Sequence, residues 1–354
     1  MDPHNRIQLS QNGKRDKVTV REATHADYET VMKIASPDTF RDGFDYLPAK
    51  FQHYVDDPDT LFYIIEFNGE AVQIWLYICM DGGEGALLKT MRLAPKWHGT
   101  GLSRLSKQGE QQLLAKLATY FVQRKKVPKA TYAVVEQRRK DVRKLLGNEV
   151  YSPFKSKVWM KNYRPFLQDV MYFGSDLTSL QQQLVEDSMG SLPALVPIQL
   201  DNMNQLLQSD VPSTVLARSG GYAFVDWDPY KLNESNMKRF VGWGHHILVD
   251  SGKPFAKSLS FGGSYMTPRG RVYHIDVHCT DEMLCKAHII GQMKHAQNRY
   301  TGMMITFCIM LVDEKLKDAV VDLCVKNLQL NHLPHDHTFA LLKHDVPNNL
   351  SSKY

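Results

Sequence analysis

The N-terminal half of the chain alternates short apolar runs with segments whose apolar residues recur at helical spacing. After a polar, basic stretch over 1–17, which is expected to be disordered, the pattern predicts a strand, two helices, three strands, a long helix and a further strand. These elements are expected at 18–23, 24–34, 48–56, 61–66, 71–80, 87–94, 101–122 and 131–135. This order of strands and helices indicates an α/β domain with a mixed sheet.

Local signals support several of these boundaries. Thr24 precedes the first helix as an N-cap, with Asp27 three residues later. Pro48 is typical of the first position of a helix. Asn68-Gly69 separates two apolar runs and predicts a tight hairpin.

The second half repeats the later part of this order. The region 174–200, which contains Pro193 and Pro197, is expected to be a linker. Strands are then predicted at 244–250, 257–262 and 272–279, a helix at 281–298, a strand at 303–311, a helix at 314–327 and a strand at 338–343. We therefore expect two domains of the same kind, over 18–173 and 201–350.

Composition excludes several classes of protein. A length of 354 residues suits two domains. The net charge of +5 is mild, and its densest sources, at 124–126, 138–140 and 143–144, are read as a solvated helix face, so no nucleic-acid partner is expected. No apolar run reaches the length of a membrane span, and no signal peptide is evident. Five cysteines without metal-ligand spacing suit reduced thiols, so we expect a cytoplasmic protein without a metal site.

The stretch 87–105 carries the clearest chemical signal. It predicts a strand that ends at Pro95, a turn through Gly99 and Gly101, and a helix. Glycines at such a turn let backbone N–H groups approach a ligand, and the start of the helix favours an anion. A pyrophosphate would fit this turn.

Two common nucleotide motifs are excluded. A Rossmann turn needs a third glycine where this chain has Arg104, and a later acidic residue that is missing. A P-loop needs Gly-Lys-Ser/Thr, which is absent.

The turn instead resembles the acetyl-CoA loop of the GNAT acyltransferases, Arg/Gln-x-x-Gly-x-Gly/Ala, which reads Lys96-Trp97-His98-Gly99-Thr100-Gly101 here. The resemblance implies a GNAT fold with acetyl-CoA as co-substrate. The residues that it assigns to the cofactor are Met91, Arg92, Leu93, Lys96, Trp97, His98, Gly99, Thr100, Gly101 and Leu102. The corresponding turn of the second half, Cys279-Thr-Asp-Glu, has two acids and no glycine, so we expect a second GNAT-like domain that binds no cofactor.

Acetyl transfer to an amine also needs a group that accepts a proton. The candidates are Glu84 before the glycine strand, His98 in the loop, and Tyr163 beyond the last strand of the first domain. Each also has a structural interpretation, as a turn residue, a solvated histidine and a half-buried tyrosine respectively.

Three further segments resemble the vertebrate histidine N-acetyltransferases. They are 43–48 with 57–59, the run Met91–Pro95, and Asp226-Trp-Asp-Pro-Tyr230-x-x-x-Glu234-Ser-Asn. The resemblance covers roughly 18–345. It places Asp45 and Tyr46, together with Trp227, Tyr230 and Glu234, at the acceptor. The residues alone would make 226–236 a proline turn that leads into a Ser- or Asn-capped helix.

The chain departs from this family at two positions beside the site and over 131–163, a region that is longer than and unlike that of the family. Lys89 stands where the family has an acid, and Lys96 replaces the Arg or Gln that opens the loop. Lys89 either opposes the incoming amine or pairs with a carboxylate of the acceptor. Two hypotheses follow: an acetyl-CoA-dependent N-acetyltransferase of a small amine or amino acid, with histidine as the leading acceptor, or a protein that binds acyl-CoA or a partner without catalysis. The oligomeric state is left open.

Overall fold

The computed structural model describes residues 17–34, 36–38, 40–98, 128–136, 166–176, 192–209, 211–251, 256–301 and 303–345, with isolated residues between 112 and 123. The chain forms two units. The first lies within residues 1–131, with Thr267–Arg269 and the residues from Asp345 on, and the second within Tyr132–Met266 and Gly270–His344. Strand β5 (Ala130–Glu136) crosses this division.

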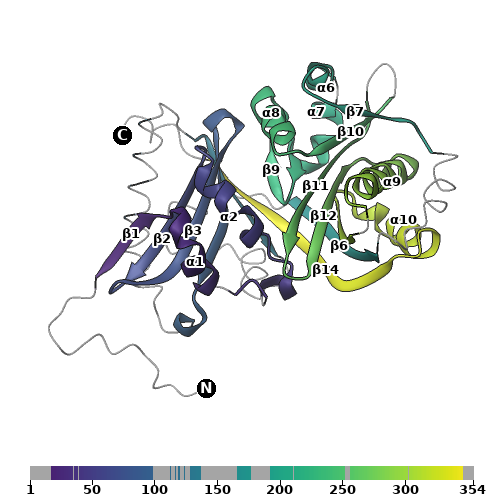
Figure 1. Ribbon diagram of the computed structural model, residues 1–354. Coiled ribbons are helices and arrows are strands. Elements are labelled where there is room, and N and C mark those ends of the chain that lie inside the picture. The colour runs from purple at the N-terminus through teal and green to yellow at the C-terminus, as the bar shows by residue number, and fades with distance from the viewer. Residues whose placement is uncertain are drawn as a thin grey trace, which may run out of the picture. The chain divides into compact units, whose positions relative to one another are not determined.

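The strands of the first unit pair antiparallel in the order β1-β2-β3-β4. Figure 1 shows helices α1 and α2 against one face of these strands. The elements are β1 (Val18–Glu22), α1 (Tyr28–Ile34), α2 (Leu47–Asp56), β2 (Thr60–Phe67), β3 (Glu70–Met80) and β4 (Gly85–Leu93), with 3₁₀ turns at His25–Asp27, Phe40–Gly43, Asp81–Gly83 and Pro95–Trp97. Strands β2 and β3 are buried almost without alternation, as expected where both faces of a sheet are covered.

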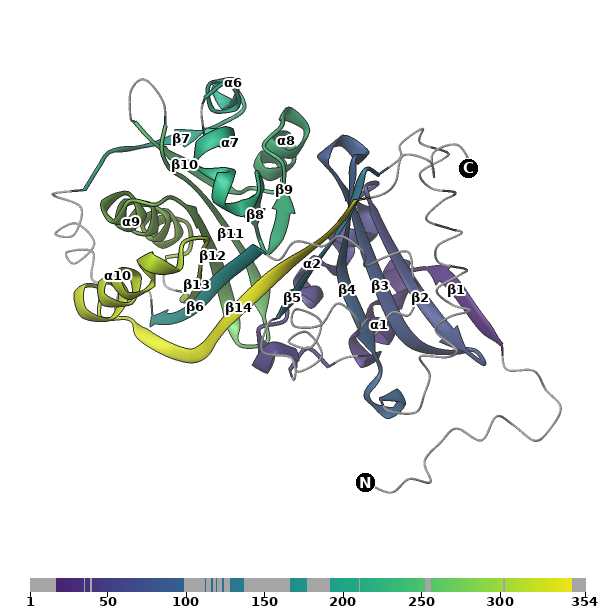
Figure 2. The same ribbon diagram turned by 180° about the vertical axis from the view of Figure 1, so that it is seen from behind.

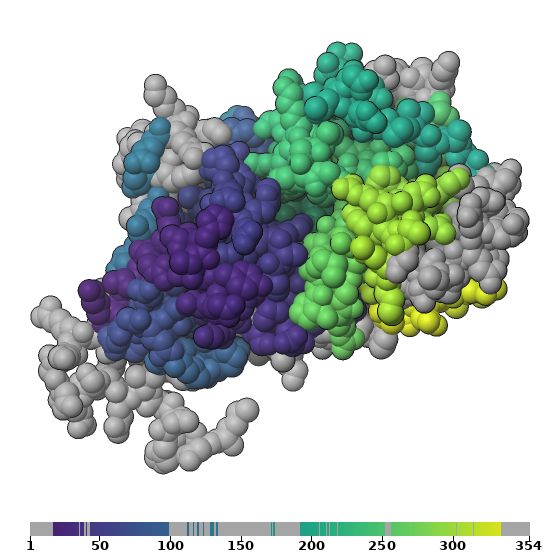
Figure 3. All heavy atoms as spheres, in the orientation of Figure 1, coloured from purple at the N-terminus to yellow at the C-terminus, as the bar shows by residue number. Residues whose placement is uncertain are grey.

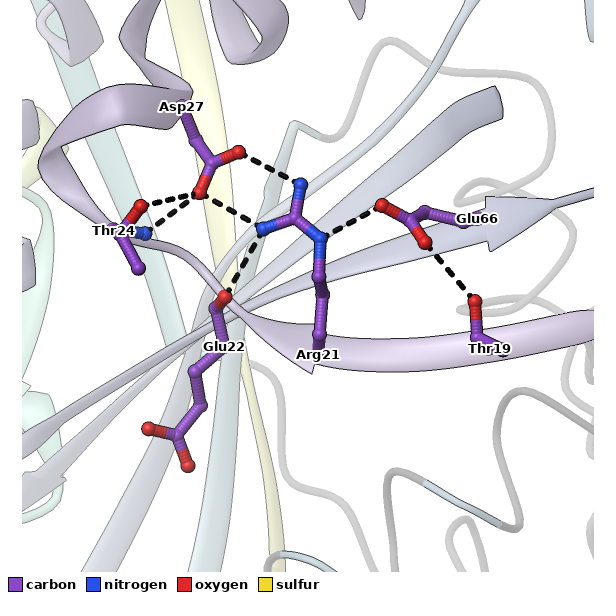
Figure 4. Close-up of polar contacts among 6 residues, drawn as sticks. All are labelled: Thr19, Arg21, Glu22, Thr24, Asp27 and Glu66. Atoms are coloured by element: carbon purple, nitrogen blue, oxygen red, sulfur yellow. Dashed lines mark hydrogen bonds and ion pairs between the residues drawn. The ribbon is translucent and has the colours of Figure 1, made fainter. Parts of the chain in front are cut away.

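The start of the first helical segment is held by the N-cap arrangement that the sequence predicts. The Asp27 carboxylate accepts hydrogen bonds from the Thr24 backbone N–H at 2.8 Å and from both terminal nitrogens of Arg21. Arg21 Nε also donates to Glu66 at 2.7 Å, as Figure 4 shows. The arginine therefore ties β1 to β2 and to the helix start.

The second unit contains a larger mixed sheet in the order β14-β6-β13-β12-β11-β10-β7. Figure 2 shows α9 and α10 on one side of it. Its main elements are β6 (Phe166–Asp176), β7 (Leu195–Ile198), β8 (Ala223–Val225), β9 (Asp228–Tyr230), α8 (Glu234–Gly242), β10 (His246–Asp250), β11 (Leu259–Thr267), β12 (Gly270–His278), α9 (Glu282–Arg299), β13 (Met304–Leu311), α10 (Lys317–Asp322) and β14 (Asn331–Asp345). Shorter helices are α6 (Met203–Leu207), α7 (Val211–Thr214) and the turns Leu216–Ser219, Glu314–Leu316 and Leu323–Asn327.

Strand β12 has two chemically different faces. Tyr273, Ile275 and Val277 belong to the apolar core that includes α9 and β13. The alternate residues His274, Asp276 and His278 are also buried, at 2% exposure each, and they point to the other face because strand side chains alternate. A row of buried polar groups therefore follows one face of this strand.

The structure agrees with many of the predicted elements but differs from the prediction in several places, strand β6 among them, which was not predicted. The segment expected as a linker contains strand β7, which pairs antiparallel with β10. The single helix expected at 314–327 is divided into a 3₁₀ turn, α10 and a π-helical turn. Most of the helix expected at 101–122 lies outside the described residues.

All five cysteines are free and buried. Among the described residues, no helix combines the length and the apolar character that a membrane span requires.

Candidate functional site

The central feature of the first unit is a β-bulge in β4 at Lys89. Thr90 pairs with Leu76 of β3 and Leu88 pairs with Tyr77, so β4 has one residue more than its partner at this point. A bulge leaves the extra residue outside the hydrogen-bonded ladder and redirects its side chain, and bulges are frequent beside active sites. The exposed side chain of Met91 follows two residues later, at 43% exposure.

A buried ion pair joins β4 to the segment before α2. The two terminal nitrogens of Arg92 each donate to one oxygen of Asp45 at 2.7 Å, and the side chains are 3% and 0% exposed. Asp45 also accepts a hydrogen bond from the Leu47 backbone N–H at 3.0 Å. The Arg92 guanidinium stacks 3.7 Å from the centre of the Phe40 ring. This pair holds the start of α2 against the strand that carries the bulge.

Tyr46 joins the same cluster from the next position. Its hydroxyl forms a buried hydrogen bond with Thr90 Oγ1. Lys89 Nζ lies 5.1 Å from the centre of the Tyr46 ring, within the range of a cation–π contact. The structure therefore brings together four residues that the sequence analysis assigns to acceptor or cofactor, namely Asp45, Tyr46, Lys89 and Arg92.

The residues expected to bind the cofactor continue past the end of β4. Lys96 is exposed and forms an ion pair with Glu70. Trp97 packs edge-on against Phe67, with ring centres 5.4 Å apart. His98 Nε2 lies 3.0 Å from the Leu93 carbonyl oxygen, which folds this residue back to the strand end. The residues expected to hold the pyrophosphate, 99–102, lie outside the described residues.

The acid–base candidates are not brought together. Glu84 precedes β4 and forms an ion pair with Lys129 at 2.6 Å, whereas His98 follows the strand. A strand of this length spans about 30 Å, so Glu84 and His98 cannot share one proton directly. Tyr163 lies outside the described residues.

The acceptor residues expected in the second unit lie on the β8–β9 hairpin and on α8. Asp226 and Trp227 form its two-residue turn, with φ of 53° and 75°. This left-handed conformation matches the right-handed twist of the flanking strands, but a bulky side chain rarely adopts it. Backbone strain of this kind persists only where the surroundings enforce it.

Contacts from β12 enforce this turn. The Asp226 backbone N–H donates to Asp276 at 2.8 Å, and the Trp227 ring lies edge-on to His274 at 5.5 Å. His274 Nε2 in turn lies 2.7 Å from the Tyr265 hydroxyl. The hairpin is thus anchored on the polar face of β12.

Two other expected acceptor residues differ sharply in exposure. Tyr230 is fully buried against Phe240, with ring centres 5.0 Å apart. Glu234 is exposed, and its hydrogen bond with Lys238 lowers its carboxyl pKa.

The structure corrects the local interpretation of this segment. Pro229 lies in strand β9 rather than in a turn. The residue that caps α8 is Asn233, whose side-chain oxygen accepts from the Asn236 backbone N–H at 2.9 Å.

The row His274, Asp276 and His278 was missed by the sequence analysis. Its signal is the alternation of polar residues within an apolar strand, which places them on one face. His278 Nε2 lies 3.2 Å from the Phe224 backbone, and burial lowers the pKa of this histidine to about 4. Among the described residues, no group of three or more His, Cys, Asp or Glu side chains is arranged to hold a metal ion.

The strand-to-helix turn of the second unit is closed to an anion. The Asp281 carboxylate accepts from the Leu284 backbone N–H at 2.9 Å and so caps α9 itself. Glu282 adds a second negative charge at this helix start. Strand β12 also pairs with β13 in unbroken parallel register from Arg271 to Val277, so its backbone groups are engaged in the sheet.

Comparisons with known proteins bear on the fold and on the family that the chain resembles. A tandem GNAT protein from the clavulanic acid biosynthesis pathway matches with a TM-score of 0.51 and 11% identity, over 94% of this chain and 100% of that structure. The family model "Histidine N-acetyltransferase, C-terminal" matches residues 191–312. The histidine N-acetyltransferase of Oreochromis niloticus is 24% identical over 91% of this chain and 90% of its own length. The probable N-acetyltransferase 16 of Homo sapiens is 23% identical over 87% of this chain and 80% of its own length.

The fold is therefore a mixed α/β fold of the GNAT type. The chain is an N-acetyltransferase that resembles the histidine N-acetyltransferase family.

Proposed function

We propose that the chain transfers an acetyl group from acetyl-CoA to a small amine or amino acid, with free histidine as the leading acceptor. The observation that carries this proposal is the bulge at Lys89, which interrupts the β3–β4 ladder four residues before the end of β4 at Leu93. A thioester held along the end of β4 would meet the acceptor at this interruption.

The cofactor would lie along Met91–Leu93 and the turn that follows. Main-chain groups of β4 would bind the pantetheine arm, and the N–H groups of 99–102 would bind the pyrophosphate. Lys96 and His98 would add positive charge or hydrogen bonds near the phosphates, because both are exposed beside this turn. The closed start of α9 supports a single cofactor per chain.

The acceptor would bind beside Lys89 and Tyr46. A lysine in this place is a point charge that can pair with the carboxylate of an amino acid. The buried Asp45–Arg92 pair would act as a support, because both oxygens of Asp45 are bonded to the two terminal nitrogens of Arg92.

The candidates to take the proton from the amine are Glu84, His98 and Tyr163. Glu84 precedes Lys89 by five residues, or about 16 Å of strand, which is beyond the reach of a direct contact or of one bridging water, so only a chain of several waters would connect it to an amine beside Lys89.

A thiol-release assay over a panel of amines tests the proposal. Wild-type protein should release CoA with histidine, and Lys89→Glu should raise the KM for histidine tenfold or more, because a charge-assisted contact of about 1.5–3 kcal/mol is replaced by repulsion. Acetyl-CoA affinity should stay the same. Histamine lacks the carboxylate, so its KM should not rise in Lys89→Glu.

Lys33→Glu supplies the matched control, since it reverses an exposed charge on α1 of the same unit. Acetylation of peptide N-termini alone would contradict a small acceptor. Tight acetyl-CoA binding without turnover of any amine would contradict catalysis. An equal KM increase for histidine and histamine in Lys89→Glu would show that Lys89 does not bind the carboxylate of the acceptor.

A further inference from the structure

The second unit carries a cluster of cationic and imidazole side chains at the C-terminal end of α9. Arg299 and His295 lie on this helix, His246 begins β10, and Arg271 lies at the start of β12. Tyr300 follows α9 directly and contacts both arginines. We refer to Arg271, Arg299, His246 and His295 as the basic cluster. Figure 3 shows α9, in yellow-green, on the surface of this unit.

The two guanidinium groups are held in place beside Tyr300. Arg271 lies 4.3 Å from the centre of this ring and donates to Ser264 Oγ at 3.1 Å. Arg299 lies 5.6 Å from the same centre, and its Nη1 is 3.5 Å from the Gly244 carbonyl oxygen. Arginine stacked on an aromatic ring keeps its planar fork of donors oriented, which suits carboxylate or phosphate oxygens.

The two histidines stack next to Arg299. The rings of His246 and His295 are 3.8 Å apart and nearly parallel at 6°. His295 and Arg299 are four residues apart on α9 and so share one helix face. Burial, His246 and Arg299 together lower the pKa of His295 to about 4. Burial is also the main cause of the lowered pKa of His246, and Arg299 adds to it.

Neither Arg271 nor Arg299 forms an ion pair with any carboxylate in the described part of the chain. Lysines on helices of the same unit do: Lys238 pairs with Glu234, and Lys286 with Glu282 on α9 itself. The carbonyl groups at the end of a helix favour a nearby cation, and this effect accounts for Arg299 alone. It does not account for Arg271 on β12.

We propose that the basic cluster binds an oxyanion group, phosphate or carboxylate, of a small molecule. The arginine forks would supply paired hydrogen bonds, and the imidazoles would add N–H donors as they protonate. The anion would relieve the repulsion that Arg299 exerts on the two histidines. The site lies at the opposite end of α9 from Asp281 and Glu282, about 27 Å along the helix, so it is separate from the place where a cofactor turn would lie in this unit.

Histidine NMR on the full-length protein tests the proposal, with ¹³C-labelled histidine and His295→Gln for assignment. Inorganic phosphate and succinate are titrated separately at constant ionic strength, with chloride as the reference. Saturable shifts of the His246 and His295 signals are expected, with a rise in the measured pKa of His295 when the anion is bound. The anion that saturates at the lower concentration identifies the group.

Two variants make the test specific. Arg299→Gln should weaken the binding tenfold or more, and Arg299 is exposed, so the fold should tolerate the change. Lys286→Gln removes the same charge from the other end of α9 and should leave binding unchanged. Non-saturating shifts, shifts of the same size with chloride, or equal affinity in Arg299→Gln would overturn the proposal.

Discussion

Strands β4 and β12, which precede the expected cofactor turn and its counterpart in the second unit, place buried polar side chains on one face in different ways. On β4, Arg92 is neutralised by Asp45 through two hydrogen bonds, and Thr90 bonds to Tyr46. On β12, the corresponding face carries two histidines and an aspartate that anchor the β8–β9 hairpin. β4 is interrupted by a bulge, whereas β12 continues unbroken beside β13.

This difference suggests that the two strands have different roles, ligand binding for β4 and structural packing for β12. An interrupted strand leaves main-chain groups and side chains available to a ligand. A strand that is fully paired in the sheet, with a helix start capped by its own aspartate, serves the packing of the unit instead. We therefore expect the first unit to bind the cofactor and the second to have a structural role at the same position.

The largest expected effect comes from breaking the buried pair on β4. Arg92→Met should lower the free energy of unfolding by about 3–5 kcal/mol, because Asp45 would be left as an uncompensated buried charge. Denaturant unfolding measures the change. The double variant Asp45→Asn/Arg92→Met should recover part of the loss, since Asn can still accept from the Leu47 backbone. A loss below 1 kcal/mol in Arg92→Met would show that the pair does not hold the site together.

The cofactor turn gives the next largest effect. Calorimetry should give one acetyl-CoA per chain, and a concentration 100 times the dissociation constant should stabilise the protein by roughly 2.7 kcal/mol. Gly101→Glu should abolish this stabilisation, because a side chain and a negative charge would block the pyrophosphate. Met283→Glu, at the start of α9, should have no effect on binding. Two equivalents per chain, or a normal response in Gly101→Glu, would contradict the contrast between the two units.

Low pH should destabilise the second unit through His278, on the polar face of β12. Its pKa is lowered from 6.5 to about 4 in the folded protein, so the unfolded chain binds more protons between these values. Stability should therefore be complete above about pH 6.5, fall by about 2 kcal/mol as the pH decreases to about 5, and fall further towards pH 4. His278→Gln should remove this part of the slope in a series of unfolding curves. An unchanged slope in the variant would mean that the buried imidazole accepts a proton without cost.

Much of the fold could be predicted because its signals are local. Thr24 with Asp27 and the Asn68-Gly69 pair act within a few residues, and the structure confirms both. Strand β7 was not predicted, because Pro193 and Pro197 indicate a linker in this part of the sequence. Pro197 is tolerated there because, among the described strands, β7 is the last of the sheet order and has β10 as its one neighbour.

The site was less predictable because its contacts join distant segments. Asp45 and Arg92 are 47 residues apart, and no local pattern shows that each neutralises the other. Asp226 and Trp227 form a tight turn without glycine, since contacts from β12 override the local preference. The bulge at Lys89 depends on the register with β3, which the sequence of β4 alone does not determine.

The smallest expected effect tests why the Asp45–Arg92 pair on β4 should contribute so much to the free energy of unfolding. The expected reason is its burial, rather than the mere presence of an arginine and an aspartate. Arg21 and Asp27 form a similar pair, but the Arg21 side chain is 40% exposed. Asp27→Asn should therefore lower the free energy of unfolding by only about 1 kcal/mol at neutral pH. Hydrogen bonds from Arg21 are the main cause that lowers the pKa of Asp27 from 3.8 to about 2. The difference in free energy of unfolding between wild type and Asp27→Asn should thus be complete above about pH 4 and disappear as the pH falls towards 2. Paired unfolding curves of wild type and variant from pH 2 to pH 7 measure it. A loss as large as that in Arg92→Met would show that exposure does not set the difference between the two pairs.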